Sequence, residues 1–454
     1  MRKSFALGLA LVVAGTLGAQ NPGTGNGEPG TVAASLQQAA SRSQVPVPGS
    51  QPAPAGSDLT IYLITMGAGD EIWARFGHDG IRIVDATTHT DTVYNWGTFD
   101  SSQPNFIRRF MTGNTQYWMQ GEGMDETIAR YRYYNRSVWV QELDLTPAER
   151  VAIRDFIAWN ARPENLYYRY DYYNDNCSTR VRDILDRFLG GQLKERFSSR
   201  LTAGTYRFHT QRSFAFDRAV ALGTNIGLGE LADQPLTEWQ AAFLPAQLSE
   251  FVRGVQIRRA DGSVRPLVKA EQTLYAAQRP QLPAEPPDTM LRNLVIGVAV
   301  AALFWWSANA ARGGSRLPRF TFATLATIWA VVNGFLGVVL IIGWTATRHV
   351  FMVRNENVLQ FDPLSLALAV VLPLAVARGV AVNAARTLSM VVLVVSIVGL
   401  AMQVLPWFNQ INGAVIALTL PAHLAVAWGV RTLTSATEHS PNRHSAAAVS
   451  RSAA

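Results

Sequence analysis

The spacing of apolar residues divides the chain into two parts. Between residues 58 and 277 the apolar residues occur in short runs and alternations, whereas beyond residue 290 they gather in long runs. The long runs span 293–311, 320–344, 364–377, 387–405 and 412–430. Each approaches the ~20 residues that a helix needs to cross a bilayer, although 364–377 is short, and buried helices of a soluble protein would carry wider polar faces. The pattern predicts a folded domain at 58–277 and a five-span membrane domain at 291–431.

Within the first part, the pattern changes repeatedly between the periods of strands and of helices. Segments rich in apolar and β-branched residues predict strands at 59–64, 80–85, 91–97 and 137–144. Thr146 to Glu149 combine a cap residue, a proline in the first turn and the glutamate of a capping box, so we expect a helix to begin there. A second capping box at 237–240 predicts a further helix. Interspersed strands and helices of this kind indicate an α+β domain.

Another predicted helix begins at Cys177. Val181, Ile184 and Phe188 follow at helical spacing and fall on the same face as the cysteine. Three cap-type residues at 174–176 precede it, and two glycines follow the last apolar turn. The thiol is therefore expected in the first helical turn, where the helix macrodipole favours the thiolate.

Cys177 is the only cysteine of the chain, so it cannot form an intrachain disulfide. Free cysteines are often buried and inert, and the position alone leaves that interpretation open. A nucleophilic thiol needs a base and a group that orients the base. His78 lies at the mouth of the strand at 80–85, and Asn95 lies on the neighbouring strand. We interpret His78 as the base and Asn95 as the orienting group.

Other polar residues near these strands offer alternatives. His89, 11 residues after His78, could orient the base instead, but it lies in a polar turn between strands. Asp79 and Asp175 are interpreted as turn and cap residues. No histidine–carboxylate spacing supports a metal site, and the chain contains neither a P-loop nor a dinucleotide-binding fingerprint, so no cofactor is expected.

Three segments of the chain resemble the periplasmic domain of the Lnb family of lipoprotein N-acyltransferases. They are Phe76–His78, Tyr94–Asp100 and Asp175–Asp183. The resemblance covers roughly residues 58–260, and the run around Cys177 is its most specific part. The histidine-before-cysteine order also resembles circularly permuted NlpC-like thiol folds. The fold implied is α+β, a circularly permuted papain/NlpC-like thiol domain followed by a polytopic α-helical membrane domain.

The resemblance also implies a reaction. The thiolate of Cys177 would attack an ester of a membrane glycerolipid, and the resulting acyl-thioester would pass its acyl chain to the N-terminal amine of a lipoprotein. The implied partners are diacylglyceryl-modified lipoproteins and membrane phospholipid. Arg180, in the cysteine motif, is assigned to substrate binding.

Part of the membrane tail resembles the extracytoplasmic loop of the same family. His349, Asn355 and Asn357 lie in this loop, at 345–363, and are assigned to substrate binding on that basis. On spacing alone they are better explained as ordinary polar loop residues. His423 lies within the fifth long run without an identifiable partner, and we leave it out of the site.

The charge distribution indicates the orientation in the membrane. The net charge is +7, but the arginines lie in loops between apolar runs and in the C-terminal tail, with no basic face carrying interleaved aromatics, which excludes a nucleic-acid partner. Arginines follow the first, third and fifth long runs, which places those loops in the cytoplasm. The thiol domain and the loop at 345–363 are then expected on the outer side of a bacterial inner membrane, in the periplasm.

The remaining segments are assigned by composition. Residues 1–19 combine Arg2-Lys3 with an apolar run and small residues, which predicts a signal peptide, with an uncleaved anchor as the alternative. Residues 20–57 are rich in Gly, Pro and Ser and predict a disordered linker. A Pro-rich linker at 278–290 and a cytoplasmic tail at 432–454 complete the chain.

Two other functions compete with the acyltransferase. A thiol amidase or peptidase acting on cell-wall peptides would use the same fold, because fold alone does not decide between these chemistries. The membrane tail favours a lipid substrate, since a soluble hydrolase would not need it. A non-enzymatic membrane scaffold would leave the combination of His78, Asn95 and Cys177 without a purpose.

Overall fold

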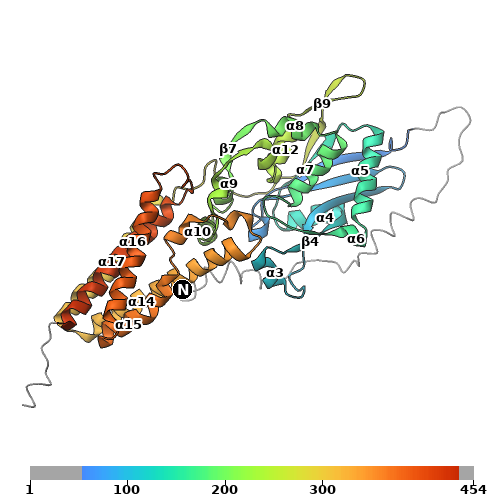
Figure 1. Ribbon diagram of the computed structural model, residues 1–454. Helices are drawn as coiled ribbons and strands as arrows, with labels where there is room; N and C mark the ends of the chain where they lie inside the picture. Colours follow the sequence, from blue (N-terminus) through green and yellow to red (C-terminus); the bar gives the residue numbers. More distant parts are fainter. Residues whose placement is uncertain (1–53, 439–454) are drawn as a thin grey trace, which may run out of the picture. The chain divides into compact units, whose positions relative to one another are not determined.

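The computed structural model describes residues 54–438 (Figure 1). The predicted signal peptide, nearly all of the linker at 20–57 and the end of the cytoplasmic tail lie outside the described residues. The chain forms two compact units. We call the first, which runs to Ala221 and continues over Gln234–Pro286, the thiol unit; the second, Leu222–Asp233 together with the chain from Pro287, is the helical unit. The predicted domain at 58–277 is thus interrupted by a segment that belongs to the helical unit.

A seven-stranded antiparallel sheet forms the centre of the thiol unit, in the order β11-β5-β1-β2-β3-β4-β6. Its strands are β1 Leu59–Met66, β2 His78–Asp85, β3 Thr90–Thr98, β4 Gln116–Gly123, β5 Val138–Leu143, β6 Tyr167–Arg169 and β11 Val268–Tyr275. The four predicted strands are confirmed as β1, β2, β3 and β5. Two small two-stranded sheets pair β7 Leu201–Thr205 with β8 Pro235–Thr237, and β9 Gln256–Arg258 with β10 Val264–Pro266.

Helices cover both faces of the sheet. The helices of the thiol unit are α3 Phe106–Thr112, α4 Met124–Tyr133, α5 Pro147–Asn160, α6 Pro163–Leu166, α7 Cys177–Phe188, α8 Gln192–Ser198, α9 Tyr206–Ser213, α11 Glu238–Ala241 and α12 Pro245–Arg253, and α10 Arg218–Gly227 crosses into the helical unit. Strand β1 shows why both faces are covered. Ile61 and Leu63 belong to the larger core with α5 and α7, while Ile64 and Met66 belong to a second core with α4. Side chains on a strand alternate between faces, so an apolar run this dense needs cover on both.

The capping boxes predicted from the sequence determine where helices begin. The Thr146 hydroxyl accepts a hydrogen bond of 3.2 Å from the Glu149 N–H, and the Glu149 carboxylate accepts one of 2.7 Å from the Thr146 N–H. The box at Thr237 and Gln240 is formed in the same way at the start of α11. Both predictions are confirmed.

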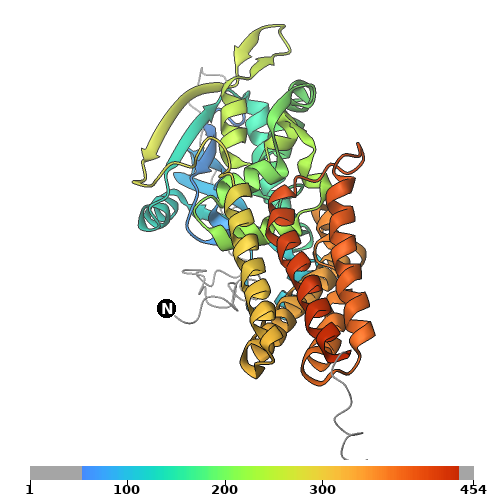
Figure 2. The same cartoon turned by 90° about the vertical axis from the view of Figure 1, so that its left-hand side faces the viewer.

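The described part of the helical unit contains five helical segments long and apolar enough to cross a membrane, as predicted, of which the third is Val350–Arg378. Its helices are α13 Met290–Ala310, α14 Arg316–Ala346, α15 Leu364–Arg378, α16 Val382–Met402 and α17 Gly413–Glu438, and Figure 2 shows them running side by side. Short 3-10 turns, η5 Val350–Met352 and η6 Glu356–Leu359, precede α15. A Cβ built on Gly297 of α13 would lie 2.5 Å from the Ala417 carbonyl oxygen of α17. A glycine therefore permits the close backbone approach that is typical of membrane helix pairs.

Candidate active site

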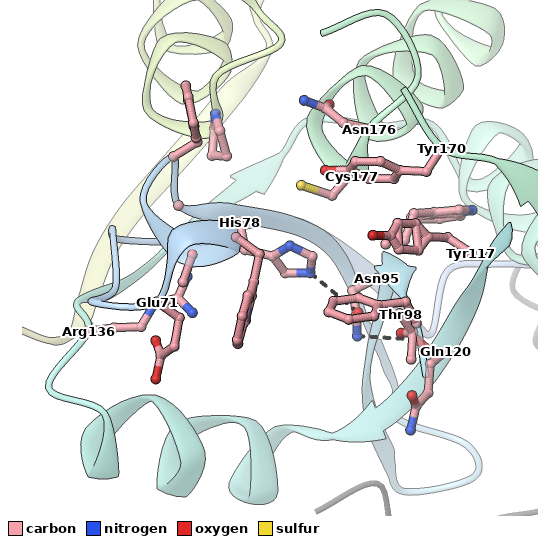
Figure 3. Close-up of a pocket in the computed structure, with 18 of the residues that line it drawn as sticks. Glu71, His78, Asn95, Thr98, Tyr117, Gln120, Arg136, Tyr170, Asn176 and Cys177 are labelled. Atoms are coloured by element: carbon pink, nitrogen blue, oxygen red, sulfur yellow. Dashed lines mark hydrogen bonds between the residues drawn. The ribbon is translucent and has the colours of Figure 1, made fainter. Parts of the chain in front are cut away.

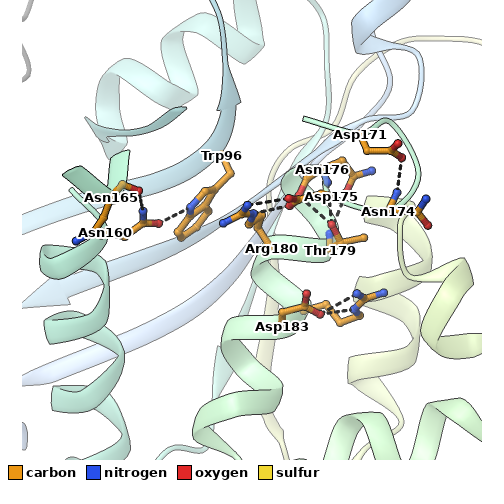
Figure 4. A network of polar contacts seen from close by, with 11 residues as sticks. Trp96, Asn160, Asn165, Asp171, Asn174, Asp175, Asn176, Thr179, Arg180 and Asp183 are labelled. Carbon is orange, nitrogen blue, oxygen red and sulfur yellow. Dashed lines mark hydrogen bonds and ion pairs between the residues drawn. The ribbon is translucent and has the colours of Figure 1, made fainter. Parts of the chain in front are cut away.

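The residue before Cys177 caps helix α7. Asn176 Oδ1 accepts a hydrogen bond of 2.9 Å from the Thr179 N–H, and the Asn176 N–H donates one of 2.8 Å to the Thr179 hydroxyl. The Asn176 amide also donates to the carbonyls of Tyr172 and Phe243, both at 2.9 Å. This reciprocal cap fixes the start of the helix (Figure 4). The prediction that Cys177 lies in the first helical turn is confirmed.

The loop leading to the cysteine is closed by its own hydrogen bonds. Asp171 and Asp175 exchange two backbone hydrogen bonds of 3.1 Å, and the Asp171 carboxylate accepts one of 2.9 Å from the Asn174 N–H. Asp175 forms an ion pair with Arg180, whose guanidinium lies 4.0 Å from the centre of the Tyr168 ring. Arg180, assigned to substrate binding from the sequence, lines a separate cavity of about 370 Å³. It does not line the cavity that contains Cys177.

His78 and Asn95 lie on the neighbouring strands β2 and β3, which pair with Gly80 opposite Asn95. His78 Nε2 lies 3.3 Å from Asn95 Oδ1, and Asn95 Nδ2 donates to the Gln120 carbonyl on β4, also at 3.3 Å. Because the Gln120 carbonyl can only accept, Asn95 presents its oxygen to His78, and the histidine proton is assigned to Nε2. This tautomer leaves Nδ1 unprotonated, on the side of the ring toward the Cys177 sulfur in Figure 3.

Gly97 on β3 keeps the space between the thiol and the imidazole open. A Cβ atom built on Gly97 would lie 3.9 Å from both Cys177 Cβ and His78 Cε1. Its φ of +102° is also a conformation that residues with a side chain rarely adopt. Gly97 therefore lies in contact distance of both side chains, and its positive φ is the reason that glycine is favoured here.

The cavity shared by Cys177, His78 and Asn95 has a volume of about 240 Å³. Aromatic side chains form much of its wall, among them Phe76, Phe99, Tyr117, Tyr170, Tyr172 and Phe243. Its charged lining residues are Glu71, Glu122, Arg130 and Arg136. A cavity that combines aromatic walls with convergent polar and charged groups is typical of a binding site for a small molecule or for part of a lipid.

Burial controls the protonation of both reactive groups. It raises the pKa of the Cys177 thiol to about 12, and the negative charge of Asp79 adds to this shift. It lowers the pKa of His78 to about 4, with the positive charge of Arg136 contributing. The macrodipole of α7 was expected to favour a thiolate, but the loss of hydration outweighs it. The resting pair is a neutral thiol beside a neutral imidazole.

Asp79 follows His78 on β2 and its side chain is completely buried. The Thr65 hydroxyl donates to Asp79 Oδ1 at 2.7 Å, and the Ser178 hydroxyl lies 2.7 Å from Asp79 Oδ2. The same Ser178 hydroxyl lies 2.8 Å from the Ala242 carbonyl oxygen. One hydroxyl proton cannot serve two acceptors, so the hydrogen bonding is complete only when Asp79 is protonated and donates to Ser178. Burial raises the pKa of Asp79 to about 7, which agrees with this count of protons.

Sequence analysis missed two residues of the site. Asp79 was interpreted as a turn residue, whereas it is buried in β2 and holds Ser178, the neighbour of Cys177. The alternation of β2 contained a signal, because a carboxylate directed inward next to His78 must find a partner. Arg136 lines the cavity from the segment between α4 and β5, and no sequence pattern marked it.

The loop residues assigned to substrate binding belong to the helical unit. Asn355 and Asn357 are completely buried, and their amide groups donate to the carbonyls of residues 225–227 at 2.8–3.2 Å. These are the last carbonyls of α10, which lack partners within their own helix. The two asparagines therefore cap α10. His349 is half-buried and its N–H donates to the Thr347 hydroxyl at 3.2 Å, before η5.

The remaining histidines considered from the sequence lie away from this chemistry. His89 is exposed in the turn between β2 and β3, with φ of +56°. His423 is buried on α17, with Nε2 3.0 Å from the Gln360 carbonyl oxygen. Among residues 54–438, no group of three or more His, Cys, Asp or Glu side chains is arranged to hold a metal ion.

These observations define a class first: an α+β domain with a histidine–asparagine–cysteine site, joined to an apolar helical bundle. Comparison with known families then assigns the domain, because residues 53–212 match the family model described as the Lnb N-terminal periplasmic domain. The match covers 160 of the 454 residues and includes His78, Asn95 and Cys177. Together with the five apolar helices it supports a multi-pass membrane protein with a periplasmic domain. Neither the curated proteins nor the solved structures contain a match to this chain.

Proposed function

We propose that the protein is a cysteine-dependent acyltransferase of the bacterial inner membrane, with its catalytic domain in the periplasm. It moves a fatty acyl chain from a glycerolipid ester to the N-terminal amine of a lipoprotein. The single observation that carries this proposal is the shared cavity of Cys177, His78 and Asn95, in which the unprotonated nitrogen of His78 faces the thiol. The circularly permuted papain/NlpC-like relationship is part of the same proposal.

The first half-reaction follows from the neutral state of the pair. As Cys177 Sγ attacks the ester carbonyl, His78 Nδ1 removes the thiol proton, so a free thiolate is never required. Collapse of the tetrahedral intermediate breaks the ester bond, and the departing glycerol oxygen takes the proton back from His78. The products are an acyl-thioester on Cys177 and a lipid with a free hydroxyl.

The second half-reaction uses the same groups in reverse order. The lipoprotein amine attacks the thioester carbonyl, and His78 takes a proton from the attacking nitrogen. The C–S bond breaks, and the proton passes to the Cys177 sulfur, which restores the resting enzyme. Asn95 holds the Nε2–H of His78 in both steps, so that Nδ1 stays directed at the sulfur. This cycle needs no cofactor.

Two features favour a lipid over a cell-wall peptide as the acyl donor. The apolar helical unit confines the protein to a membrane, where glycerolipids are concentrated. The aromatic side chains of the cavity wall also offer a surface against which an acyl chain can pack. A thiol amidase acting on cell-wall peptides remains the rival, and the experiment below separates the two.

The test is to trap the covalent intermediate. Incubation of the purified full-length protein with a diacylated lipopeptide, stopped at mildly acidic pH, should raise the protein mass by one acyl chain. Neutral hydroxylamine should remove this mass, because thioesters are far more labile than amides. Mass spectrometry of lipoprotein N-termini from cells lacking the protein should show the loss of N-acylation. If muropeptides are cleaved and no lipid adduct forms, the protein is an amidase and the proposal of an acyltransferase is wrong.

A further inference from the structure

The cavity contains a guanidinium that protein groups do not fully satisfy. Arg136 Nε donates to the Gly67 carbonyl at 2.8 Å, and the guanidinium carbon lies 4.6 Å from the centre of the Tyr131 ring. Arg136 Nη2 is buried and has no hydrogen-bond partner among the described residues. An unpaired buried N–H on a charged group is rare in proteins, and a bound ligand is a common reason for it.

The other arginine of the cavity is already neutralised. Arg130 forms an ion pair with Glu122, which leaves little net charge from these two residues. Arg136, by contrast, forms no ion pair with any carboxylate of residues 54–438. Its charge still reaches the reacting groups, because it contributes to the depressed pKa of His78. The free positive charge of the cavity is therefore centred on Arg136.

A carboxylate accompanies Arg136 without pairing with it. A Cβ built on Gly69 would lie 3.1 Å from Arg136 Cδ and 3.3 Å from Glu71 Oε2, so both side chains flank this glycine. Figure 3 shows Arg136 and Glu71 on the opposite side of His78 from Asn95 and Gln120. This edge of the cavity thus presents one positive and one negative group near the nucleophile.

We infer that this edge recognises the headgroup of the acyl donor, a zwitterionic glycerophospholipid. The phosphodiester lies against Arg136, whose planar guanidinium suits phosphate oxygens, and the headgroup ammonium lies beside Glu71. The ester of the same lipid then lies near Cys177. The inference rests on the proposed function, since it names the donor of that reaction and makes Arg136 a specificity-determining residue.

A binding measurement tests this without requiring turnover. The full-length Cys177→Ala protein in detergent is titrated with dihexanoylphosphatidylethanolamine, dihexanoylglycerol and free phosphoethanolamine, with heat as the readout. We expect the phospholipid to bind at least about tenfold more tightly than either of the others. Adding Arg136→Met should remove most of that advantage, Arg136→Lys should keep part of it, and Glu71→Gln should weaken the phospholipid alone.

Arg132 provides the matched control. It is an exposed arginine of α4 that lies over the Tyr275 ring and does not line the cavity, so Arg132→Met should leave all three affinities unchanged. Equal binding of dihexanoylglycerol and the phospholipid would overturn the inference, as would an equal loss of both in Arg136→Met. Equal binding of free phosphoethanolamine would show an anion site unrelated to lipid and would also overturn it. The proposed function fails separately, when wild-type protein forms no acyl-thioester.

Discussion

The Asn355 cap in the helical unit and the Cys177 cavity in the thiol unit both contain buried polar side chains, but the hydrogen bonding of Asn355 differs from that of Arg136. In the helical unit, Asn355 donates to two carbonyls of α10 and accepts hydrogen bonds from Asn357 and Gln410. In the thiol unit, His78 keeps one ring nitrogen and Arg136 one guanidinium nitrogen without partners among the described residues. Saturated polar groups maintain a fold, whereas unsaturated ones around a cavity are available to a ligand.

The largest effect is expected from the nucleophile itself. Cys177→Ala and Cys177→Ser should lower the rate of acyl transfer at least about a thousandfold, because no other group can form the thioester. Membrane insertion and thermal stability should change little, since the thiol accounts for little of the packing. Activity is measured on lipopeptide with purified protein. Activity of Cys177→Ala within tenfold of wild type would contradict its assignment as the nucleophile.

Loss of the base, His78, should slow formation of the acyl adduct more than loss of Asn95, which orients the base. His78→Ala should slow formation of the acyl adduct by about a hundredfold or more, because the neutral thiol then lacks a proton acceptor. Asn95→Ala should cost about tenfold, since His78 can still reach the sulfur in some orientations. The adduct is followed by mass against time. If Asn95→Ala were the more damaging change, His78 would not be the base.

Removal of the Asn355 cap of α10 should lower the stability of the protein without changing the rate of acyl transfer. Asn355→Ala should lower the free energy of unfolding of the helical unit by about 2 kcal/mol, because buried carbonyls of α10 lose their donors. The rate per folded molecule should stay near that of wild type. Thermal unfolding in detergent and the acyl-transfer rate are measured on the same preparation. A loss of activity without a loss of stability would instead support the assignment of Asn355 to substrate binding.

The smallest effect is expected from Asp79 and depends on pH. Its pKa is raised from 3.8 to about 7, so the folded protein holds this proton more tightly than the unfolded chain. The stability linked to this proton is present below pH 3.8 and is lost as the pH rises toward 7. Ionised Asp79 also opposes a negative charge on Cys177.

Asp79→Asn tests this dependence with a close substitute. The amide donates to Ser178 and accepts from Thr65, as the protonated acid does, but it has no proton to lose. The variant should match the activity of wild type at about pH 5 and exceed it a few-fold above about pH 7, while its advantage in heat stability should grow from about pH 4 to about pH 7. Rate and melting temperature are recorded across the pH range. Identical pH profiles for the two proteins would show that Asp79 does not titrate as described.

The sequence predicted the elements whose signals are local. The cap at Asn176 and the capping box at Thr146 depend on residues within three positions of one another, and both form as expected. Strands β4, β6 and β11 were not predicted, because β4 and β6 lie in aromatic-rich stretches and β11 is largely exposed, so none shows a clear alternation. Their positions depend on the sheet partners that they find at long range.

The candidate active site was also predictable only in part. The placement of His78 and Asn95 follows from two adjacent strands, and the resemblance to a known family pointed to the same residues. The protonation states were not predictable, because they depend on how much water the folded site excludes. Asn355 and Asn357 cap α10, which the sequence did not indicate, and their assignment to substrate binding stays a prediction. Their partners are carbonyls of α10, about 130 residues earlier in the chain.

The segment Leu222–Asp233 has a consequence for biosynthesis. It leaves the ribosome before the helical unit to which it belongs, and its carbonyl at Leu228 accepts a hydrogen bond from Gln410 at 3.0 Å. The Gly229 N–H of the same segment donates to the Phe351 carbonyl at 2.6 Å, and this partner is also synthesised later. The two units therefore cannot mature in simple order from the N-terminus. A truncated protein that stops before α13 would lack these partners of Leu222–Asp233, so we expect this segment to be more accessible to proteases in the truncated protein.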